Sequence, residues 1–219
     1  MFRFRQFSIA QDRCAMKVGT DGVLLGAWAE GGARILDVGT GTGVVALMMA
    51  QRYADARVVA IDIDEGAVGQ ARQNVASSPF ADRVAVIREA VQQHAGCYDA
   101  VVSNPPFFID SLGAPDERRS MARHARTLGY GELMEAAWRL LTADGELSVI
   151  VPFDYRRRME DEAVFRGFFL HRVCAVHTAA RKPARRYLLS FRKEPCERCL
   201  EAMTVGDERY QRLTEAFYL

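Results

Sequence analysis

Residues 34–43, which read RILDVGTGTG, decide the fold. The first half of this stretch, residues 34–38, is a short apolar run of the kind found in buried parallel strands. Three glycines then alternate with threonines, and the apolar residues 44–51 (VVALMMAQ) that follow are typical of a helix. A strand, a glycine loop and a helix in this order predict an α/β fold with a dinucleotide- or nucleoside-binding turn.

The glycine spacing and the acid before it narrow the choice of ligand. Gly39, Gly41 and Gly43 follow a G-x-G-x-G pattern, and Asp37 stands inside the end of the strand. A pyrophosphate uses the helix N-terminus as its anion site, and an acid two residues before Gly39 would repel it. Asp37 instead suits a ligand that carries a cationic amine or a sulfonium. We therefore expect Asp37 and the three glycines to bind such a cofactor.

A second strand, predicted over residues 58–64 (VVAIDID), brings another acid to the same edge of the sheet. Asp62 lies 23 positions beyond Gly39, near the separation at which such folds place a ribose-binding carboxylate. Its two oxygens can accept hydrogen bonds from both hydroxyls of an unphosphorylated ribose, and Ile63 would then lie against the adenine. The alternative interpretation is a solvated strand end, which the glycine loop upstream disfavours.

A third strand is predicted over residues 84–88 (VAVIR), and Glu89 follows it. Glu89 could accept a hydrogen bond from the adenine amine of the cofactor, or it could be a surface charge. Upstream, residues 17–22 (KVGTDG) form a glycine-flanked turn before an apolar helix. Asp21 could cap that helix, but a cap alone does not explain the two glycines and the threonine around it. Thr20 and Asp21 are therefore candidate cofactor contacts.

The fourth strand, residues 98–103 (YDAVVS), ends in Asn104-Pro105-Pro106-Phe107. The prolines deny the sheet further donors, which leaves the Asn104 side chain and the Pro105 carbonyl at the carboxyl edge, where open α/β sheets bind ligands. Two acceptors there can hold the two hydrogens of a planar amine while it receives a methyl group, with Phe107 stacked on its ring. A plain strand-ending turn is the alternative.

Two basic segments are candidates for contact with nucleic acid. Residues 110–129 form a long polar insertion that is basic from Arg118 on and includes Arg123; it is either a lid or substrate-binding loop, or a solvated loop. Residues 181–193 contain six basic residues and no acid. Lys182, Arg185 and Arg186 in this segment are predicted phosphate contacts.

Composition limits the remaining possibilities. The chain has 219 residues, 49% of them apolar, and a net charge of +1, which predicts one soluble domain without a bulk nucleic-acid signature. No apolar run approaches the length of a membrane span, and the N-terminus lacks a signal-peptide core. We therefore expect a cytoplasmic protein. Five irregularly spaced cysteines, with Cys196 and Cys199 lacking a second ligand pair, predict neither a disulfide framework nor a metal site.

The remaining elements follow from periodicity and turn signals. Helices are predicted over residues 65–76 and 130–141, and strands over residues 146–151, 168–178 and 186–192. Residues 2–9 predict a short hairpin arm outside the main sheet, and the apolar residues 213–219 are expected to dock onto the domain.

In this order the motifs resemble class I S-adenosylmethionine-dependent methyltransferases, and more narrowly the branch that methylates amino groups. Four short motifs resemble the small bacterial family that methylates adenine N6 just 3′ of the anticodon of valine tRNA. They are residues 17–22 (KVGTDG), 123–125 (RHA), 182–186 (KPARR) and 217–219 (FYL).

The resemblance implies a Rossmann-like sheet of seven strands in the order 3-2-1-4-5-7-6, with strand 7 antiparallel. It implies a single methyltransferase domain over residues 1–219, with an N-terminal arm and first helix at 1–30 and the core at 31–219. S-adenosylmethionine would be the cofactor and tRNA the partner, with no metal and no obligate protein partner.

Three other functions share part of this pattern. A glutamine N5 methyltransferase acting on a release factor or ribosomal protein uses the same tetrapeptide, but usually follows an N-terminal helical domain. An adenine N6 methyltransferase acting on DNA normally has a separate target-recognition domain, and one acting on rRNA would use the same chemistry. A non-enzymatic nucleotide-binding module has no need of Asn104 and Phe107.

Overall fold

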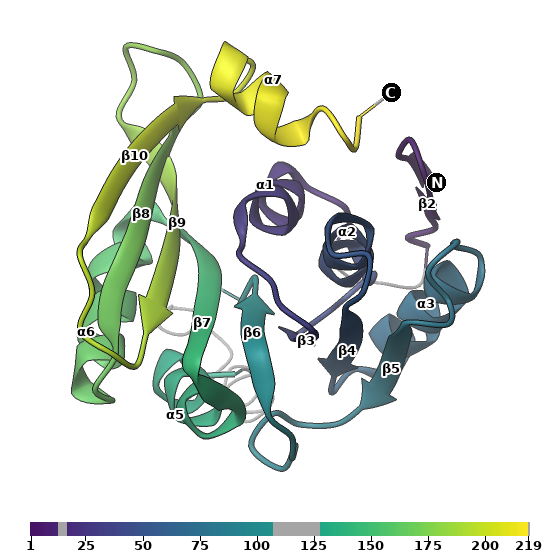
Figure 1. Cartoon of the computed structure of the whole chain (residues 1–219). Coiled ribbons are helices and arrows are strands. Elements are labelled where there is room, and N and C mark those ends of the chain that lie inside the picture. Colours follow the sequence, from purple (N-terminus) through teal and green to yellow (C-terminus); the bar gives the residue numbers. More distant parts are fainter. Residues whose placement is uncertain (13–16, 107–127, 219) are drawn as a thin grey trace, which may run out of the picture.

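One eight-stranded sheet runs through the structure, a computed structural model that describes residues 1–12, 17–106 and 128–218 (Figure 1). Its strands are β3 (Arg34–Val38), β4 (Arg57–Asp62), β5 (Val84–Arg88), β6 (Tyr98–Ser103), β7 (Leu141–Pro152), β8 (Phe169–His177), β9 (Ala184–Arg192) and β10 (Cys199–Thr204). The helices are α1 (Thr20–Trp28), α2 (Val44–Arg52), α3 (Glu65–Ala76), α5 (Tyr130–Leu140), α6 (Arg156–Phe165) and α7 (Glu208–Thr214), with the 3-10 turn η1 at Phe153–Tyr155.

The strand order confirms the predicted topology and adds one strand to it. Across the sheet the order is β5-β4-β3-β6-β7-β9-β8-β10. Counted along the chain from β3, the first seven strands stand in the order 3-2-1-4-5-7-6, and the seventh, β9, is antiparallel to both neighbours. The eighth strand, β10, pairs in parallel with β8 and was not predicted. The sheet therefore has eight strands and not seven.

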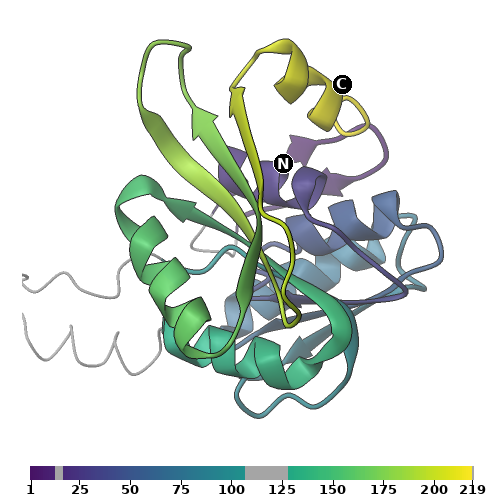
Figure 2. The ribbon, with the colours of Figure 1, turned by 60° about the vertical axis from the view of Figure 1, so that its left-hand side comes forward.

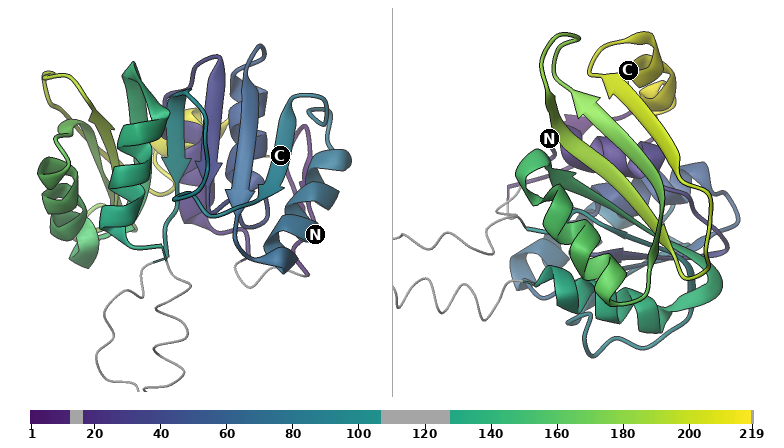
Figure 3. Two further views of the ribbon diagram at one scale, coloured as in Figure 1. Left: turned by 90° about the horizontal axis from the view of Figure 1, so that it is seen from below. Right: turned by 90° about the vertical axis from the view of Figure 1, so that its left-hand side faces the viewer.

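Successive residues of the inner strands enter two separate cores. Ile35 of β3 packs in one core with α1 and α2, and Leu36 packs in the other with α5 and α6. The same alternation holds along β6, where Val102 belongs to the first core and Val101 to the second. Because both faces are covered by helices, the residues of these strands that enter the cores are mostly apolar (Figures 1 and 3).

The parallel strands β3 to β7 all end at one edge of the sheet, which we call the carboxyl edge. The glycine loop follows β3 there, Asp62 ends β4, and Asn104 follows β6. Because β9 is antiparallel, it starts at the same edge, with Arg186 paired to Pro152 at the end of β7. The loop between β8 and β9 projects beyond the sheet (Figure 2). Residues from most of the chain thus meet at the carboxyl edge.

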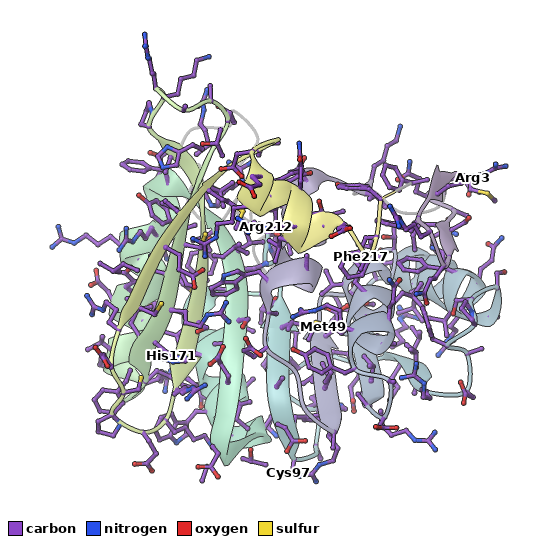
Figure 4. All side chains as sticks on the ribbon, turned by 45° about the horizontal axis from the view of Figure 1, so that its top comes forward. Arg3, Met49, Cys97, His171, Arg212 and Phe217 are labelled. Atoms are coloured by element: carbon purple, nitrogen blue, oxygen red, sulfur yellow. The ribbon has the colours of Figure 1, made fainter. Side chains whose placement is uncertain are left out.

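The two ends of the chain pack together on the α1–α2 side. The strands β1 (Phe2–Arg3) and β2 (Ser8–Ile9) form the predicted hairpin, and Phe4 stacks on Phe7 at 4.7 Å between ring centroids. Phe217 is buried and lies between α7 and this hairpin, with its carbonyl accepting a hydrogen bond from the Arg5 amide (Figure 4). Docking of the C-terminal segment is therefore confirmed. Within the three described ranges, no helix has the length and apolar character needed to span a bilayer.

The close packing of α1 on α2 gives a prediction about stability. A Cβ at Gly26 of α1 would lie 2.9 Å from both Cβ and Sδ of Met48 on α2. We expect Gly26→Ala to lower the free energy of unfolding by about 1–3 kcal/mol, because the two helices must move apart. Urea unfolding measures this change.

Gly69→Ala is the matched control. Gly69 lies in α3, and a Cβ there meets nothing within 4 Å. Alanine is the better helix former, so this variant should gain up to about 1 kcal/mol. Equal effects of the two substitutions would contradict the close approach of α1 and α2.

Candidate functional site

The glycine loop between β3 and α2 has a backbone that favours glycine at three places. Gly39, Gly41 and Gly43 have φ values of 70°, 56° and 81°, in the left-handed region. The amides of Gly39 and Thr40 both donate to the Ile61 carbonyl, at 2.9 and 3.0 Å, which fixes the loop to the end of β4. A Cβ at Gly39 would meet nothing within 4 Å, so the space beside this residue is open to a ligand.

Asp37 lies beneath this loop. Its side chain is buried, and Oδ2 accepts hydrogen bonds from the Thr40 hydroxyl at 2.6 Å and from the Ala46 amide at 3.1 Å. Burial raises the pKa of the Asp37 carboxyl from 3.8 to about 7, while the bonds from Thr40 and Ala46 lower it and the charge of Asp62 raises it. Asp37 therefore shapes the glycine loop, and its predicted contact with a cationic ligand stays a prediction.

The raised pKa of Asp37 predicts a pH dependence of stability. The unfolded chain releases the Asp37 proton near pH 3.8 and the folded chain near pH 7, so the contribution of this group is fully present below pH 3.8 and is lost as the pH rises to 7. Asparagine keeps an oxygen for Thr40 and Ala46 without ionising. Between pH 4 and 7, Asp37→Asn should therefore gain up to about 4 kcal/mol of unfolding free energy relative to the wild type.

Urea unfolding at pH 4, 5.5 and 7 measures this difference. Asp55→Asn, at an exposed carboxyl outside the site, controls for the general loss of a charge. A constant difference between Asp37→Asn and the wild type across the three pH values would show that Asp37 ionises alike in the folded and unfolded chains.

Asp62 is tied to the glycine loop from the neighbouring strand. Its Oδ2 accepts a hydrogen bond from the Gly41 amide at 3.0 Å, and its Oδ1 accepts one from the Asp64 amide at 2.9 Å. Each carboxylate oxygen retains a further lone pair for a ligand. The next residue, Ile63, is 46% exposed although it is apolar. The predicted ribose acceptor and the predicted apolar contact thus stand side by side at the carboxyl edge.

Glu89 is held by His94, which in turn contacts Tyr98, and neither contact was predicted from the sequence. Its Oε2 is hydrogen bonded to Nδ1 of His94, and Nε2 of the same ring is 2.7 Å from the Tyr98 hydroxyl. His94 is only 5% exposed, so Glu89 is not an isolated surface charge. The only sequence signal is a lone histidine in the polar stretch between β5 and β6, and a lone histidine does not identify its partners.

Asn104 stands next to the glycine loop. Ser103 pairs with Val38, and the Ser103 hydroxyl donates to the Val38 carbonyl at 2.9 Å, which ties the end of β6 to the residue before Gly39. The Asn104 Oδ1 atom is buried and has no hydrogen-bond partner among residues 1–12, 17–106 and 128–218. Pro105 is buried beside it. A buried acceptor without a donor costs free energy, so this oxygen is a candidate contact for a ligand.

The structure also joins a predicted cofactor contact, Asp21, to a predicted phosphate contact, Arg186. Gly19 is the N-cap of α1, and Asp21 in its first turn makes no capping bond, so the interpretation of Asp21 as a cap is wrong. Instead, its Oδ2 accepts a hydrogen bond from Nε of Arg186 at 2.8 Å. Arg186 was predicted as a phosphate contact and Asp21 as a cofactor contact; the two form one ion pair.

Of the remaining predicted site residues, some are exposed and others lie outside the described residues. Thr20, Lys182 and Arg185 are exposed, the last two on the loop between β8 and β9 and at the start of β9. Phe107 and Arg123, together with most of the 110–129 insertion, lie outside the described residues. Among the residues that are described, no cluster of three or more His, Cys, Asp or Glu side chains is arranged to hold a metal ion.

Comparison with known proteins identifies relatives over the whole chain. Residues 18–169 match the family model of the methyltransferase small domain. The tRNA1(Val) (adenine(37)-N6)-methyltransferase of Bacteroides thetaiotaomicron is 44% identical, over 100% of this chain and 97% of its own length. The protein of the same name from Aeromonas hydrophila is also 44% identical, with the same coverage of both chains.

A solved structure supports the fold independently. The crystal structure of a predicted O-methyltransferase from Agrobacterium tumefaciens superposes with a TM-score of 0.69, covering 90% of this chain and 96% of the other. The two sequences are 18% identical, so the likeness bears on the fold alone.

Proposed function

The chain belongs to the methyltransferase small domain family and within it to the tRNA1(Val) (adenine(37)-N6)-methyltransferases, and from this premise we propose what it does. It transfers a methyl group from S-adenosylmethionine to the exocyclic N6 amine of an adenine in tRNA. The target is the adenine 3′ of the anticodon in valine tRNA, and the enzyme works in the cytoplasm as one methyltransferase domain over residues 1–219.

One observation carries the proposal: Oδ1 of Asn104 is buried beside the glycine loop and has no partner in the described part of the chain. An exocyclic adenine amine is a poor nucleophile because its lone pair is delocalised into the ring. The Asn104 oxygen and the Pro105 carbonyl accept hydrogen bonds from the two N–H groups of this amine. These bonds favour a pyramidal nitrogen whose lone pair faces the sulfonium methyl group. The nitrogen can lose a proton after the transfer, so no dedicated general base is required.

The residues around the loop suit the cofactor. The space at Gly39 is open, Asp62 offers carboxylate lone pairs for the ribose hydroxyls, and the exposed Ile63 offers an apolar surface for the adenine. Glu89, oriented by His94, would accept a bond from the adenine amine. When bound, S-adenosylmethionine supplies the electrophilic methyl group. The negative charge of Asp62 and Glu89 favours a cationic ligand over a pyrophosphate.

Recognition of the substrate falls to residues at the same edge. An adenine amine is reached only when the base is unstacked, as in a loop or a flipped nucleotide. Phe107 would stack on that base. Arg123, Lys182, Arg185 and Arg186 would contact phosphates, with affinity that falls as salt increases.

The experiment offers the purified protein several acceptors together with S-adenosylmethionine labelled in its methyl group. Bulk tRNA, DNA, rRNA and ribosomal proteins are incubated separately, and the labelled product is digested and identified. N6-methyladenosine in tRNA is expected. A valine tRNA transcript with guanine in place of adenine 37 should lose the label. Label on glutamine, only on DNA, or only on rRNA would overturn the proposal.

A further inference from the structure

A second aromatic surface lies at the carboxyl edge, one strand away from Asn104. We call it the aromatic ledge and define it as Phe153, Tyr187 and Arg156. Phe153 begins η1 directly after β7, Tyr187 lies on β9, and Arg156 begins α6. Phe153 is 54% exposed, which is a large apolar surface for a residue next to a candidate active site.

The ledge is held rigidly from below. The Phe153 and Tyr187 rings have centroids 6.2 Å apart with their planes inclined by 39°. The Arg156 guanidinium lies 4.3 Å from the Tyr187 ring centroid, and its Nε donates to Glu160 Oε1 at 2.7 Å. Tyr187 is also fixed in the sheet by its pairing with Val151. A base that stacks on Phe153 would therefore meet a surface that is already ordered.

The strand register sets the distance between the ledge and the amine acceptor. Ser103 of β6 pairs with Val149 of β7, so Asn104 stands one residue past this pair and Phe153 four residues past it. The difference of three residues corresponds to roughly 10 Å along the strand direction. One flexible strand of RNA can reach both places.

The basic segment 181–193 beside the ledge favours nucleic acid as its occupant. The neighbouring loop between β8 and β9 and the start of β9 carry the exposed Arg181, Lys182 and Arg185, and residues 181–193 contain no acid. An exposed aromatic ring beside a one-sign basic segment is the arrangement that binds single-stranded nucleic acid, with phosphates on the cations and bases on the ring. An apolar protein partner would have no use for the basic segment.

We propose that Phe153 stacks on a second nucleobase of the RNA strand whose adenine is methylated. The inference rests on the proposed function and deepens it, because it assigns a base-binding subsite outside the catalytic tetrapeptide. Stacking tolerates any base, so the subsite contributes affinity and orientation for the substrate and does not select a sequence.

The test compares Phe153 variants for steady-state methylation of valine tRNA. Phe153→Ala should raise KM for tRNA about tenfold, equivalent to about 1.4 kcal/mol, with kcat and the Kd for S-adenosylmethionine unchanged. Phe153→Leu, which is apolar but cannot stack, should show most of this rise in KM. Phe153→Trp, which keeps an aromatic ring, should have the KM of the wild type.

Phe165→Ala is the matched control. Phe165 is 79% exposed at the far end of α6, near the start of β8 and thus at the opposite edge of the sheet. It should leave KM unchanged. Thermal melts of all variants check that they are folded, and the exposure of both rings leads us to expect little change.

The outcomes separate this inference from the proposed function. If the wild type does not methylate tRNA, the proposed function itself is overturned. If the wild type methylates tRNA but Phe153→Ala keeps its KM, or Phe153→Leu behaves as wild type, the stacking subsite is overturned and the proposed function stands. A change in oligomeric state with an unchanged KM would likewise overturn the inference, because the ring would then cover a protein contact.

Discussion

Alanine in place of Asn104 is expected to lower kcat for tRNA methylation by about 10²- to 10³-fold, the usual cost of removing one preorganised group that stabilises a transition state. The substitution removes the buried Oδ1 that would accept a hydrogen of the target amine. The Kd for S-adenosylmethionine should not change, because the glycine loop and Asp62 keep their own hydrogen bonds. Single-turnover methylation and calorimetric titration with the cofactor measure the two quantities.

Stability separates this role from a structural one. Because no described residue donates a hydrogen bond to Oδ1 of Asn104, its removal should leave Tm within about 2 °C of the wild type or raise it. Ser148→Ala is the matched control, since the Ser148 hydroxyl is also buried and unpartnered but lies in the middle of β7. It should keep full activity. If Asn104→Ala unfolds the protein or loses the cofactor, Asn104 has a structural role at the end of β6.

The strands β3, β5 and β6 could be predicted from the sequence because each is a short, mostly apolar run closed by a turn signal. The predicted bounds at residues 34–38, 84–88 and 98–103 coincide with β3, β5 and β6. In β3 and β6 both faces are largely buried, so nearly every residue contributes to the signal, whereas β5 is an edge strand with Ile87 38% exposed and was recognised from its apolar composition. The glycine loop could be predicted as well, because its left-handed φ values at three positions favour glycine at those positions in the sequence.

The strand β10 escaped prediction because its own residues are mostly exposed and carry no sustained apolar pattern. Among its six residues only Met203 is buried, and Glu201 interrupts the apolar pattern. Glu201 has its own role in the structure, since it accepts a hydrogen bond from the Trp28 indole and pairs with Arg209 at 2.7 Å. An edge strand held by polar contacts to distant elements leaves no periodic signal in its own sequence.

The missed parts of the candidate site are contacts between elements. Asp21 and Arg186 are 165 positions apart, and nothing in either local sequence indicates that they pair. The sequence could place Glu89 at the carboxyl edge, but it could not show that His94, buried five residues later, would orient it. Residue types and strand ends are readable from a sequence, whereas the partners of a side chain depend on the packing of the whole sheet.

Replacing Asp62 with alanine is expected to weaken binding of S-adenosylmethionine by about 100-fold or more. The variant lacks the carboxylate to which both ribose hydroxyls would donate hydrogen bonds. Asp62→Asn should fall between this variant and the wild type, because an amide keeps one acceptor oxygen. Asp64→Ala is the control: Asp64 lies two residues on, its Oδ1 caps α3 through the Ala67 amide at 2.7 Å, and it should cost about 1 kcal/mol of stability without changing the Kd.

A cofactor analogue decides how Asp62 acts. Asp62 also accepts the Gly41 amide, so a loss of binding in Asp62→Ala could arise from a displaced glycine loop instead of a lost ribose contact. An S-adenosylmethionine analogue without the ribose 2′-hydroxyl distinguishes the two causes. The Asp62→Ala substitution and the removal of the hydroxyl are combined as in a double-mutant cycle. If Asp62 binds the ribose, the wild type should bind the analogue more weakly than the cofactor, and Asp62→Ala should bind both alike. Equal binding of both ligands by the wild type would contradict a contact between Asp62 and the 2′-hydroxyl, and the loss in Asp62→Ala would then be assigned to the displaced glycine loop.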